Sequence, residues 1–235
     1  MKKLIILLAV FLLSFSTTQA LTFDGSNDYI TVADKDSLDL TQMTVSAWFR
    51  QTVASQNGVI SKGAGTGGTD NYLLQTWSDK KAYFSIFSVT QRQVSSGTTL
   101  IPLNQWFHLA GTYDGVTLRL YLNGQQVGTL GVAVTPTVNT GPLEIGRDNA
   151  STDGVFYFPG KIDEVRVYNR ALSPSEIKSL YYGKYISYTG LVGYWPLWNN
   201  SLPFVPDLSG RKSHGSAVGS PVTTISRPPI GRYRR

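Results

Sequence analysis

The amino-acid sequence predicts an all-β protein in which two antiparallel sheets pack as a sandwich, with one short helix late in the chain. Apolar and polar residues alternate with a period of two over residues 43–50 and again over residues 116–122, which is the pattern of strands that bury one face. Residues 173–183 are the one segment with convincing helix signals. Many strands and a single late helix are typical of the all-β class.

The first 20 residues have the layout of a secretory signal peptide. Lys2 and Lys3 precede an apolar run from Leu4 to Phe15, and small residues then lead to Ala20. This run is shorter than the roughly 20 residues that cross a bilayer. We therefore expect residues 1–20 to be removed on export, leaving a mature chain without a membrane span; a retained N-terminal anchor is the alternative. The chain has no cysteine, so disulfides and a lipid-modified cysteine are excluded.

Strand signals follow one another through the middle of the chain. A glycine-rich stretch at residues 62–68 predicts a loop after the first alternating segment. Residues 83–90 are apolar on both faces, which predicts a strand inside the sandwich. The strand predicted over residues 116–122 runs directly into Asn123-Gly124, a strong hairpin signal because both residues accept positive φ.

The predicted helix has defined signals at both ends. Ser173 is placed to cap it, Pro174 stands at the first helical position and Glu176 at the third, which together form a capping box. Ile177 continues an apolar stripe, and Gly183 can end the helix in a left-handed turn. We expect about two turns of helix.

Six segments, in this order, carry a resemblance to a known family. They are residues 21–30 (LTFDGSNDYI), 44–49 (TVSAWF), 106–115 (WFHLAGTYDG), 120–124 (LYLNG), 143–147 (LEIGR) and 160–173 (GKIDEVRVYNRALS). Together they resemble the laminin G-like, concanavalin A-like lectin/glucanase superfamily of bacterial and phage surface proteins. The resemblance implies a jelly-roll domain, which we place at residues 21–220.

The order of segments departs from that family in one place. Gly190 to Leu197 resembles a segment with which such domains usually begin, yet here it comes last. Because domain termini often lie close together, we expect residues 190–220 to be a circularly permuted first strand segment. It should pair beside the strand that begins at Leu21 and bury Trp195. The alternative is the start of a truncated second repeat.

The sequence favours binding over catalysis. Glycosidases with this fold carry a Glu-x-Asp-x-x-Glu pattern on one strand, and this chain has no such pattern. The neighbouring Asp163 and Glu164 would point to opposite faces of a strand, so they cannot act as a carboxylate pair. A Gly-x-Ser-x-Gly elbow is also missing. The protein is therefore predicted not to be an enzyme, and His108 is predicted to be structural.

The resemblance implies a structural calcium ion near the rim of the sandwich. Asp24 and Asp163 occupy positions where relatives often supply carboxylates, with Asp28 and Glu164 as weaker candidates. Ca²⁺ takes about six to eight oxygen ligands, so carbonyl groups and water would complete the shell. The alternative is that Asp24 caps a turn before Gly25 and that Asp163 pairs with a neighbouring basic residue.

Aromatic residues make up 12% of the chain, and some of them could stack on sugar rings. The predicted ligand-binding cluster combines rings, amides and a carboxylate just after the glycine-rich loop. Its members are Asp70, Asn71, Tyr72, Gln75 and Trp77. The alternative is that Tyr72 and Trp77 serve packing. A second aromatic cluster, Phe156 to Phe158, is expected to contribute one or two residues to the core.

The net charge of +6 lies at the two ends of the chain. Without the two N-terminal lysines and the four arginines after residue 226, the formal charge is zero. Specific nucleic-acid binding is therefore not expected, and residues 221–235 are predicted to be a flexible basic tail.

The sequence as a whole predicts a non-catalytic, lectin-like module that is secreted or displayed on a cell or virion surface. Its partner would be a glycan or another surface molecule. The alternative is a structural or adhesive protein of a virion or cell envelope, which uses the fold for protein–protein contact. Either function is compatible with an oligomer.

Overall fold

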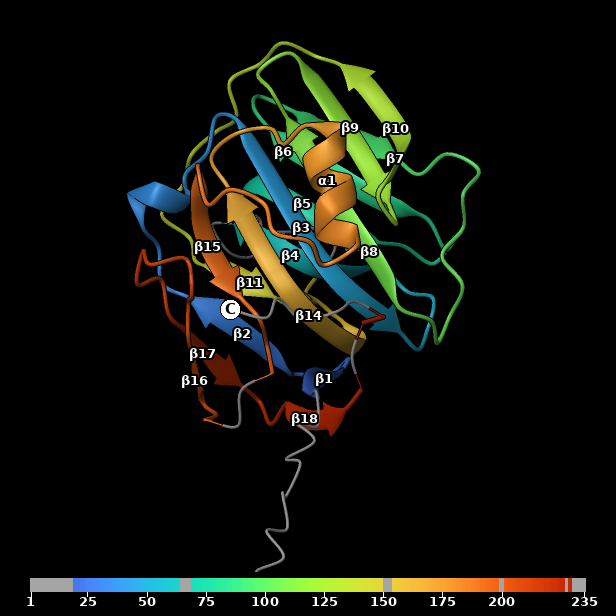
Figure 1. The fold of residues 1–235 in the computed structure, drawn as a ribbon, viewed down its shortest axis with the longest axis vertical. Coiled ribbons are helices and arrows are strands. Elements are labelled where there is room, and N and C mark those ends of the chain that lie inside the picture. The colour runs from blue at the N-terminus through green and yellow to red at the C-terminus, as the bar shows by residue number, and fades with distance from the viewer. Residues whose placement is uncertain (1–18, 64–68, 150–153, 199–200, 227, 230–235) are drawn as a thin grey trace, which may run out of the picture.

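The computed structural model describes residues 19–63, 69–149, 154–198, 201–226 and 228–229. Two eight-stranded antiparallel sheets pack face to face (Figure 1), and we call them sheet A and sheet B. The predicted all-β sandwich is confirmed. Within the described ranges, no helix has the length and apolarity that crossing a bilayer requires.

Sheet A has the strand order β10-β9-β8-β3-β14-β1-β18, and β15 also pairs with β14. Its strands are β1 (Gln19–Asp24), β3 (Met43–Gln51), β8 (Phe107–Tyr113), β9 (Thr117–Leu122), β10 (Gln125–Gly131), β14 (Pro159–Tyr168), β15 (Leu191–Trp195) and β18 (Val222–Ile225).

Sheet B has the strand order β16-β17-β2-β11-β4-β5-β6-β7. Its strands are β2 (Tyr29–Val32), β4 (Asn57–Gly63), β5 (Asp70–Thr76), β6 (Ala82–Phe87), β7 (Gln91–Ser95), β11 (Leu143–Ile145), β16 (Phe204–Val205) and β17 (Gly215–Val218). A small two-stranded ribbon consists of β12 (Arg147–Asp148) and β13 (Phe156–Tyr157). The helices are the 3-10 turn η1 (Asp36–Leu38) and α1 (Pro174–Tyr181).

The core fills the space between the two sheets. Alternate residues of β3, β8 and β14 meet alternate residues of β4, β5 and β6, and all of them are buried. The sheets approach closely at Gly111, where a Cβ atom would lie 2.2 Å from the ring of Phe84. A side chain at position 111 would therefore push the two sheets apart.

Local sequence signals produce the predicted hairpin and helix. Asn123 and Gly124 turn β9 into β10 with φ values of 51° and 77°. The capping box of α1 is present, because Ser173 Oγ accepts from the N–H of Glu176 and the Glu176 carboxylate accepts from the N–H of Ser173. Ile177 then packs with Tyr121 and other side chains in a second apolar cluster, on the outer face of sheet A.

The C-terminal segment completes the sandwich, but with a different partner from the one predicted. β15 pairs with β14, not with β1, which uses the other end of the same edge of β14. Between the two lies an irregularity at Asp163–Glu164, where Glu164 has a φ of 54°. Trp195 is fully buried, as predicted, and its indole N–H donates to the carbonyl of Ser213 over 2.9 Å.

Both ends of the predicted domain, residues 21 and 220, lie at or next to strands of sheet A. β1 begins at Gln19, two residues before the predicted mature start, and residues 1–18 lie outside the described ranges. The tail predicted from residue 221 is wrong over Val222–Ile225, which form β18 and pair with β1. This stretch is rich in β-branched residues and occupies the otherwise open edge of β1. Arg227 and residues 230–235 lie outside the described ranges.

Candidate functional site

Four of the five residues predicted to bind ligand lie on β5, a central strand of sheet B, and Trp77 follows directly after it. Their side chains divide between the two faces of the sheet. Leu74 pairs with Phe84 of β6, and both belong to the core between the sheets. Leu73 and Gln75 pair with Ser85 and Tyr83. Because strand residues alternate, these four side chains lie on the outer face of sheet B.

Asn71 and Tyr72 belong to the interior, so their prediction as ligand-binding residues is not supported. The Asn71 amide binds the backbone of Leu40 at both its N–H and its carbonyl, and it also donates to the carbonyl of Thr137. Tyr72 packs in the core, where burial raises the pKa of its phenol well above 10. Both side chains therefore hold the fold together.

A bulge puts Asp70 on the outer face with Gln75. Lys62 pairs with Tyr72 and Gly63 pairs with Asp70, so Asn71 is an extra residue in β5. An extra residue shifts the alternation of a strand by one. Asp70, Gln75 and the following Trp77 therefore share the outer face of sheet B.

An aromatic pair stands at one end of this face. The rings of Trp77 and Tyr83 lie 4.8 Å apart, and both side chains are half-buried. The phenol of Tyr83 donates to Asp79 over 2.7 Å, which holds its ring in place. Tyr83 was missed in the sequence, although its position opposite Gln75 follows from alternation on β6.

Amide and hydroxyl groups extend the face toward the edge of the sheet. The side-chain amides of Gln91 and Gln93 on β7 both donate to Ser85 Oγ, over 3.0 and 3.1 Å. The prediction of an interior strand at residues 83–90 holds for the inward residues of β6, but β6 ends at Phe87 and Val89 is exposed. The polar residues at every second position of β6 and β7 were the signal for this outer face.

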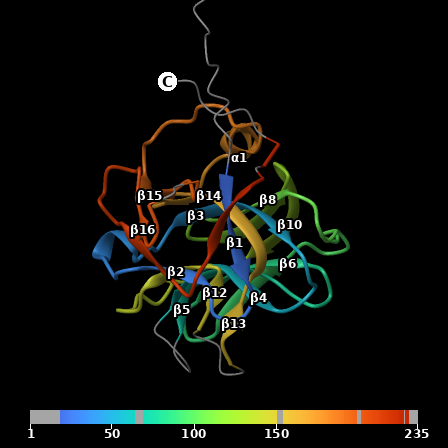
Figure 2. The same ribbon diagram turned by 90° about the horizontal axis from the view of Figure 1, so that it is seen from below.

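Carboxylates gather at the other end of the face. Asp70 lies within electrostatic reach of Asp148 on β12 and Glu144 on β11. Burial and these two like charges raise the pKa of Asp70 to about 9. Glu144 is neutralised by an ion pair with Arg147, whose guanidinium also lies 3.5 Å from the ring centroid of Tyr29. Figure 2 shows β12 and β13 on the side of the sandwich opposite α1.

Three buried polar atoms of this face have no hydrogen-bond partner among the described residues. They are Asp70 Oδ1, Gln75 Oε1 and Trp77 Nε1. Such atoms are uncommon in folded proteins because each one costs free energy, and their presence points to water, an ion or a ligand as the missing partner. They come from the three predicted site residues that share the outer face.

The predicted calcium pair is not assembled. Asp24 pairs with Pro159, whereas Asp163 follows Ile162, the partner of Leu21. Four residues of strand separate the two positions, or about 13 Å. Asp24 caps its own turn, accepting from the N–H groups of residues 26 to 28. The strand register therefore keeps these two aspartates too far apart to share an ion, and within the described ranges no group of three or more His, Cys, Asp or Glu side chains is arranged to hold a metal ion.

The remaining residues singled out in the sequence are structural. His108 is buried under α1, with its ring 5.5 Å from that of Trp48 and 6.3 Å from that of Tyr181. Phe158 is a core residue that packs edge-on against Phe49. Tyr157 faces Tyr29 at 6.2 Å. One of the second aromatic cluster thus belongs to the core, within the range predicted.

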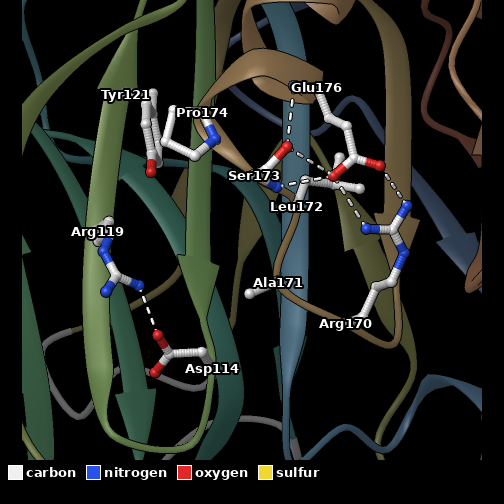
Figure 3. A pocket seen from close by; sticks show the side chains of 9 residues that line it. All are labelled: Asp114, Arg119, Tyr121, Arg170, Ala171, Leu172, Ser173, Pro174 and Glu176. Atoms are coloured by element: carbon white, nitrogen blue, oxygen red, sulfur yellow. Dashed lines mark hydrogen bonds and ion pairs between the residues drawn. The ribbon is translucent and has the colours of Figure 1, made fainter.

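A pocket of about 530 Å³ lies on the opposite side of the molecule, on the outer face of sheet A. Figure 3 shows two ion pairs on its walls, Asp114 with Arg119 and Arg170 with Glu176. Tyr121 and Leu172 also line the pocket but are almost fully buried. The four charged side chains are each about three-tenths exposed.

Comparisons with known proteins find both a sequence relative and structures with a similar fold. Human pappalysin-1 is 29% identical over 136 residues, which is 50% of this chain but only 8% of pappalysin-1. A candidate carbohydrate-binding protein from Bacteroides ovatus superposes with a TM-score of 0.71 at 22% identity, over 91% of this chain and 61% of the other. The CBM40 module of a Ruminococcus gnavus sialidase, solved with α2,3-sialyllactose, gives a TM-score of 0.55 at 16% identity, over 70% and 98%.

The family model of the concanavalin A-like lectin/glucanase superfamily matches residues 24–178, which include most of both sheets and the start of α1. Six short motifs, a two-sheet sandwich and this match lead to one conclusion: the chain belongs to the concanavalin A-like lectin/glucanase superfamily.

Proposed function

We propose that the protein is an exported, non-catalytic module that binds a glycan on the outer face of sheet B. The observation that carries the proposal is the set of three buried, unpartnered polar atoms on Asp70, Gln75 and Trp77. One carboxylate oxygen, one amide oxygen and one indole N–H can together accept two hydroxyl protons and donate to a third oxygen. Because the three groups are spread along β5, from the end with the carboxylates to the end with the aromatic pair, the hydroxyls of successive units of an extended glycan would supply that combination.

The aromatic pair supplies the second half of sugar recognition. A pyranose ring has a flat C–H face that packs against aromatic rings, and Trp77 with Tyr83 forms such a surface at the end of β5. The amides of Gln91 and Gln93 lie on the same face and can reach further hydroxyls. Two structural neighbours, a candidate carbohydrate-binding protein and a module solved with a bound sugar, support this choice of ligand.

We propose that calcium binds at Asp70 and Asp148, and not at Asp24 and Asp163 as predicted from the sequence. Two buried carboxylates that repel each other are stabilised by a divalent cation between them, and Asp70 Oδ1 has a free coordination position. Calcium would complete its shell of about six to eight oxygens from amide groups, water and sugar hydroxyls.

Substitution of Trp77 tests the glycan site. We expect Trp77→Ala to weaken binding of any ligand found on a glycan array by about tenfold or more, because a central aromatic contact is lost. The control is Trp198→Ala, which changes a more exposed tryptophan outside the strands of sheet B and should bind normally. Array and calorimetric titrations provide the measurement. A wild-type protein that binds no glycan yet forms stable oligomers would instead support a structural or adhesive role.

Calcium should stabilise the folded protein only while both carboxylates are present. We expect added Ca²⁺ to raise the melting temperature of the wild-type protein, since an ion that binds only the native state stabilises it by mass action. Asp70→Asn or Asp148→Asn should abolish that rise. Asp24→Asn should keep the response, even though it weakens a turn. A calcium response that survives both of the first substitutions would contradict the proposed ligands.

A further inference from the structure

We propose that the pocket of Figure 3 is a second binding site, which takes the oxyanion group of an acidic saccharide, either a carboxylate or a sulfate ester. It lies on the outer face of sheet A, beside the first turn of α1, and does not depend on the site proposed on sheet B. The acceptors on the charged side chains of this pocket are mostly used by hydrogen bonds within the protein, whereas several of the donors are not.

The two carboxylates of the pocket are occupied by local hydrogen bonds. Asp114 Oδ1 accepts from the N–H groups of Val116 and Thr117, over 3.0 and 2.8 Å, and its Oδ2 accepts from Arg119 over 2.6 Å. Glu176 accepts from the N–H and hydroxyl of Ser173 at one oxygen and from Arg170 at both. The carboxylates therefore offer little further accepting capacity.

The two guanidinium groups keep donors to spare. Each arginine has five N–H donors. Partners within the described ranges take one donor of Arg119, which goes to Asp114. They take three donors of Arg170, two of which go to Glu176 and one to the carbonyl of Thr189. Arg119 and Arg170 stand on opposite walls of the pocket (Figure 3). Among the four charged side chains of the pocket, the hydrogen-bonding positions that remain unused are therefore almost all donors.

A donor-rich pocket selects a ligand group made of acceptors. Carboxylate and sulfate groups form short, charge-assisted hydrogen bonds to guanidinium and have no proton to place at neutral pH. The helix end is not the source of this selectivity. Pro174 has no N–H, and the capping box uses the groups of Ser173 and Glu176. Arg119 and Arg170 are therefore the side chains that offer donors to an anion.

The size and the apolar lining of the pocket indicate a saccharide, as opposed to a free inorganic ion. Its volume of about 530 Å³ lies within the usual range for small-molecule sites. Ala171 and Pro174 line it with accessible apolar surface against which the C–H face of a sugar ring can pack, whereas Tyr121 and Leu172 are almost fully buried. If both proposed sites are used, one chain can hold two glycans on opposite sides of the sandwich.

The test compares four probes on the full-length exported protein: trigalacturonate, a sulfated disaccharide, a neutral galactose trimer and inorganic sulfate. We expect one or both of the acidic saccharides to bind, and whichever does identifies the oxyanion. Arg119→Gln and Arg170→Gln should each weaken that binding by about tenfold or more. Arg92→Gln changes an exposed arginine on β7 and should have no effect. Trp77→Ala should also leave it unchanged, which separates this result from the fate of the sheet B site.

Three results would overturn the proposal. The first is that neither acidic saccharide binds better than the neutral trimer. The second is that inorganic sulfate binds as tightly as the acidic saccharides, which leaves no role for the sugar. The third is that both arginine variants bind like the wild-type protein. Because Arg170 also anchors α1 through Glu176, Arg119→Gln is the decisive variant if Arg170→Gln proves unstable.

Discussion

A chain that ends after Thr189 is expected to lose its stable monomeric fold. The truncation removes four strands, among them β15 and β17, which pair with β14 and β2 in the two sheets. It also removes Trp195, one of the largest fully buried side chains. Loss of one such side chain alone costs about 3–5 kcal/mol, against a total stability of about 5–15 kcal/mol for a typical domain.

Unfolding in urea, followed by tryptophan fluorescence and size-exclusion chromatography, measures this effect. The matched control ends after Ser226, keeps β18 complete, and should change the free energy of unfolding by less than about 1 kcal/mol. The truncated chain also exposes one edge of β2 and part of an edge of β14, so aggregation is the expected outcome at high concentration. A soluble monomer with wild-type stability would show that residues 190–226 are dispensable.

The elements of this fold could be predicted where their signals are local. The hairpin depends on two adjacent residues that tolerate positive φ, and α1 depends on a capping box within four residues. The partner of β15 could not be predicted in the same way. It depends on how β1 and β15 share one edge of β14, and no local pattern encodes that division.

The candidate site was predicted only in part for the same reason. Asp70, Gln75 and Trp77 do share the outer face of sheet B, but a bulge turns Asn71 inward and Tyr72 points inward by the ordinary alternation of the strand. Asp148, which lies within electrostatic reach of Asp70, belongs to a segment distant in the sequence, and only the folded structure brings it to sheet B. The calcium ligands were carried over from a resemblance, and the pairing of β1 with β14 keeps those two aspartates apart.

The contribution of His108 to the stability of the protein is expected to fall as the pH drops below about 6.5, because His108 must stay neutral in the folded state. Burial, assisted by the positive charge of Arg166, lowers the pKa of His108 from 6.5 to about 3. A depressed folded pKa means that the unfolded chain binds the proton more readily. The contribution of neutral His108 is therefore fully present above pH 6.5 and is lost as the pH falls toward 3.

The expected slope is at most about 1.4 kcal/mol per pH unit, so the whole window corresponds to a loss on the order of 4 kcal/mol. Glu176 adds to acid sensitivity only at lower pH, since its ion pair with Arg170 lowers the pKa of its carboxyl from 4.5 to about 2. In a variant in which Asp70 is replaced by Asn, the interval between pH 6.5 and 4.5 therefore isolates the histidine. In the wild-type protein Asp70, whose folded pKa is about 9, contributes a slope of opposite sign over the same interval. Urea unfolding at pH 7, 6 and 5 provides the measurement.

His108→Phe should flatten this pH dependence, because a neutral ring of similar size can occupy the space between Trp48 and Tyr181. His108→Gln serves the same purpose if the larger ring does not fit. His214 is exposed, so His214→Gln is the matched control and should keep the wild-type slope. Equal stability of the Asp70→Asn variant at pH 7 and pH 5 would mean that the buried imidazole reaches solvent or a proton acceptor when it is charged. The prediction would then be wrong for His108, and the acid sensitivity of the fold would rest on its carboxylates alone.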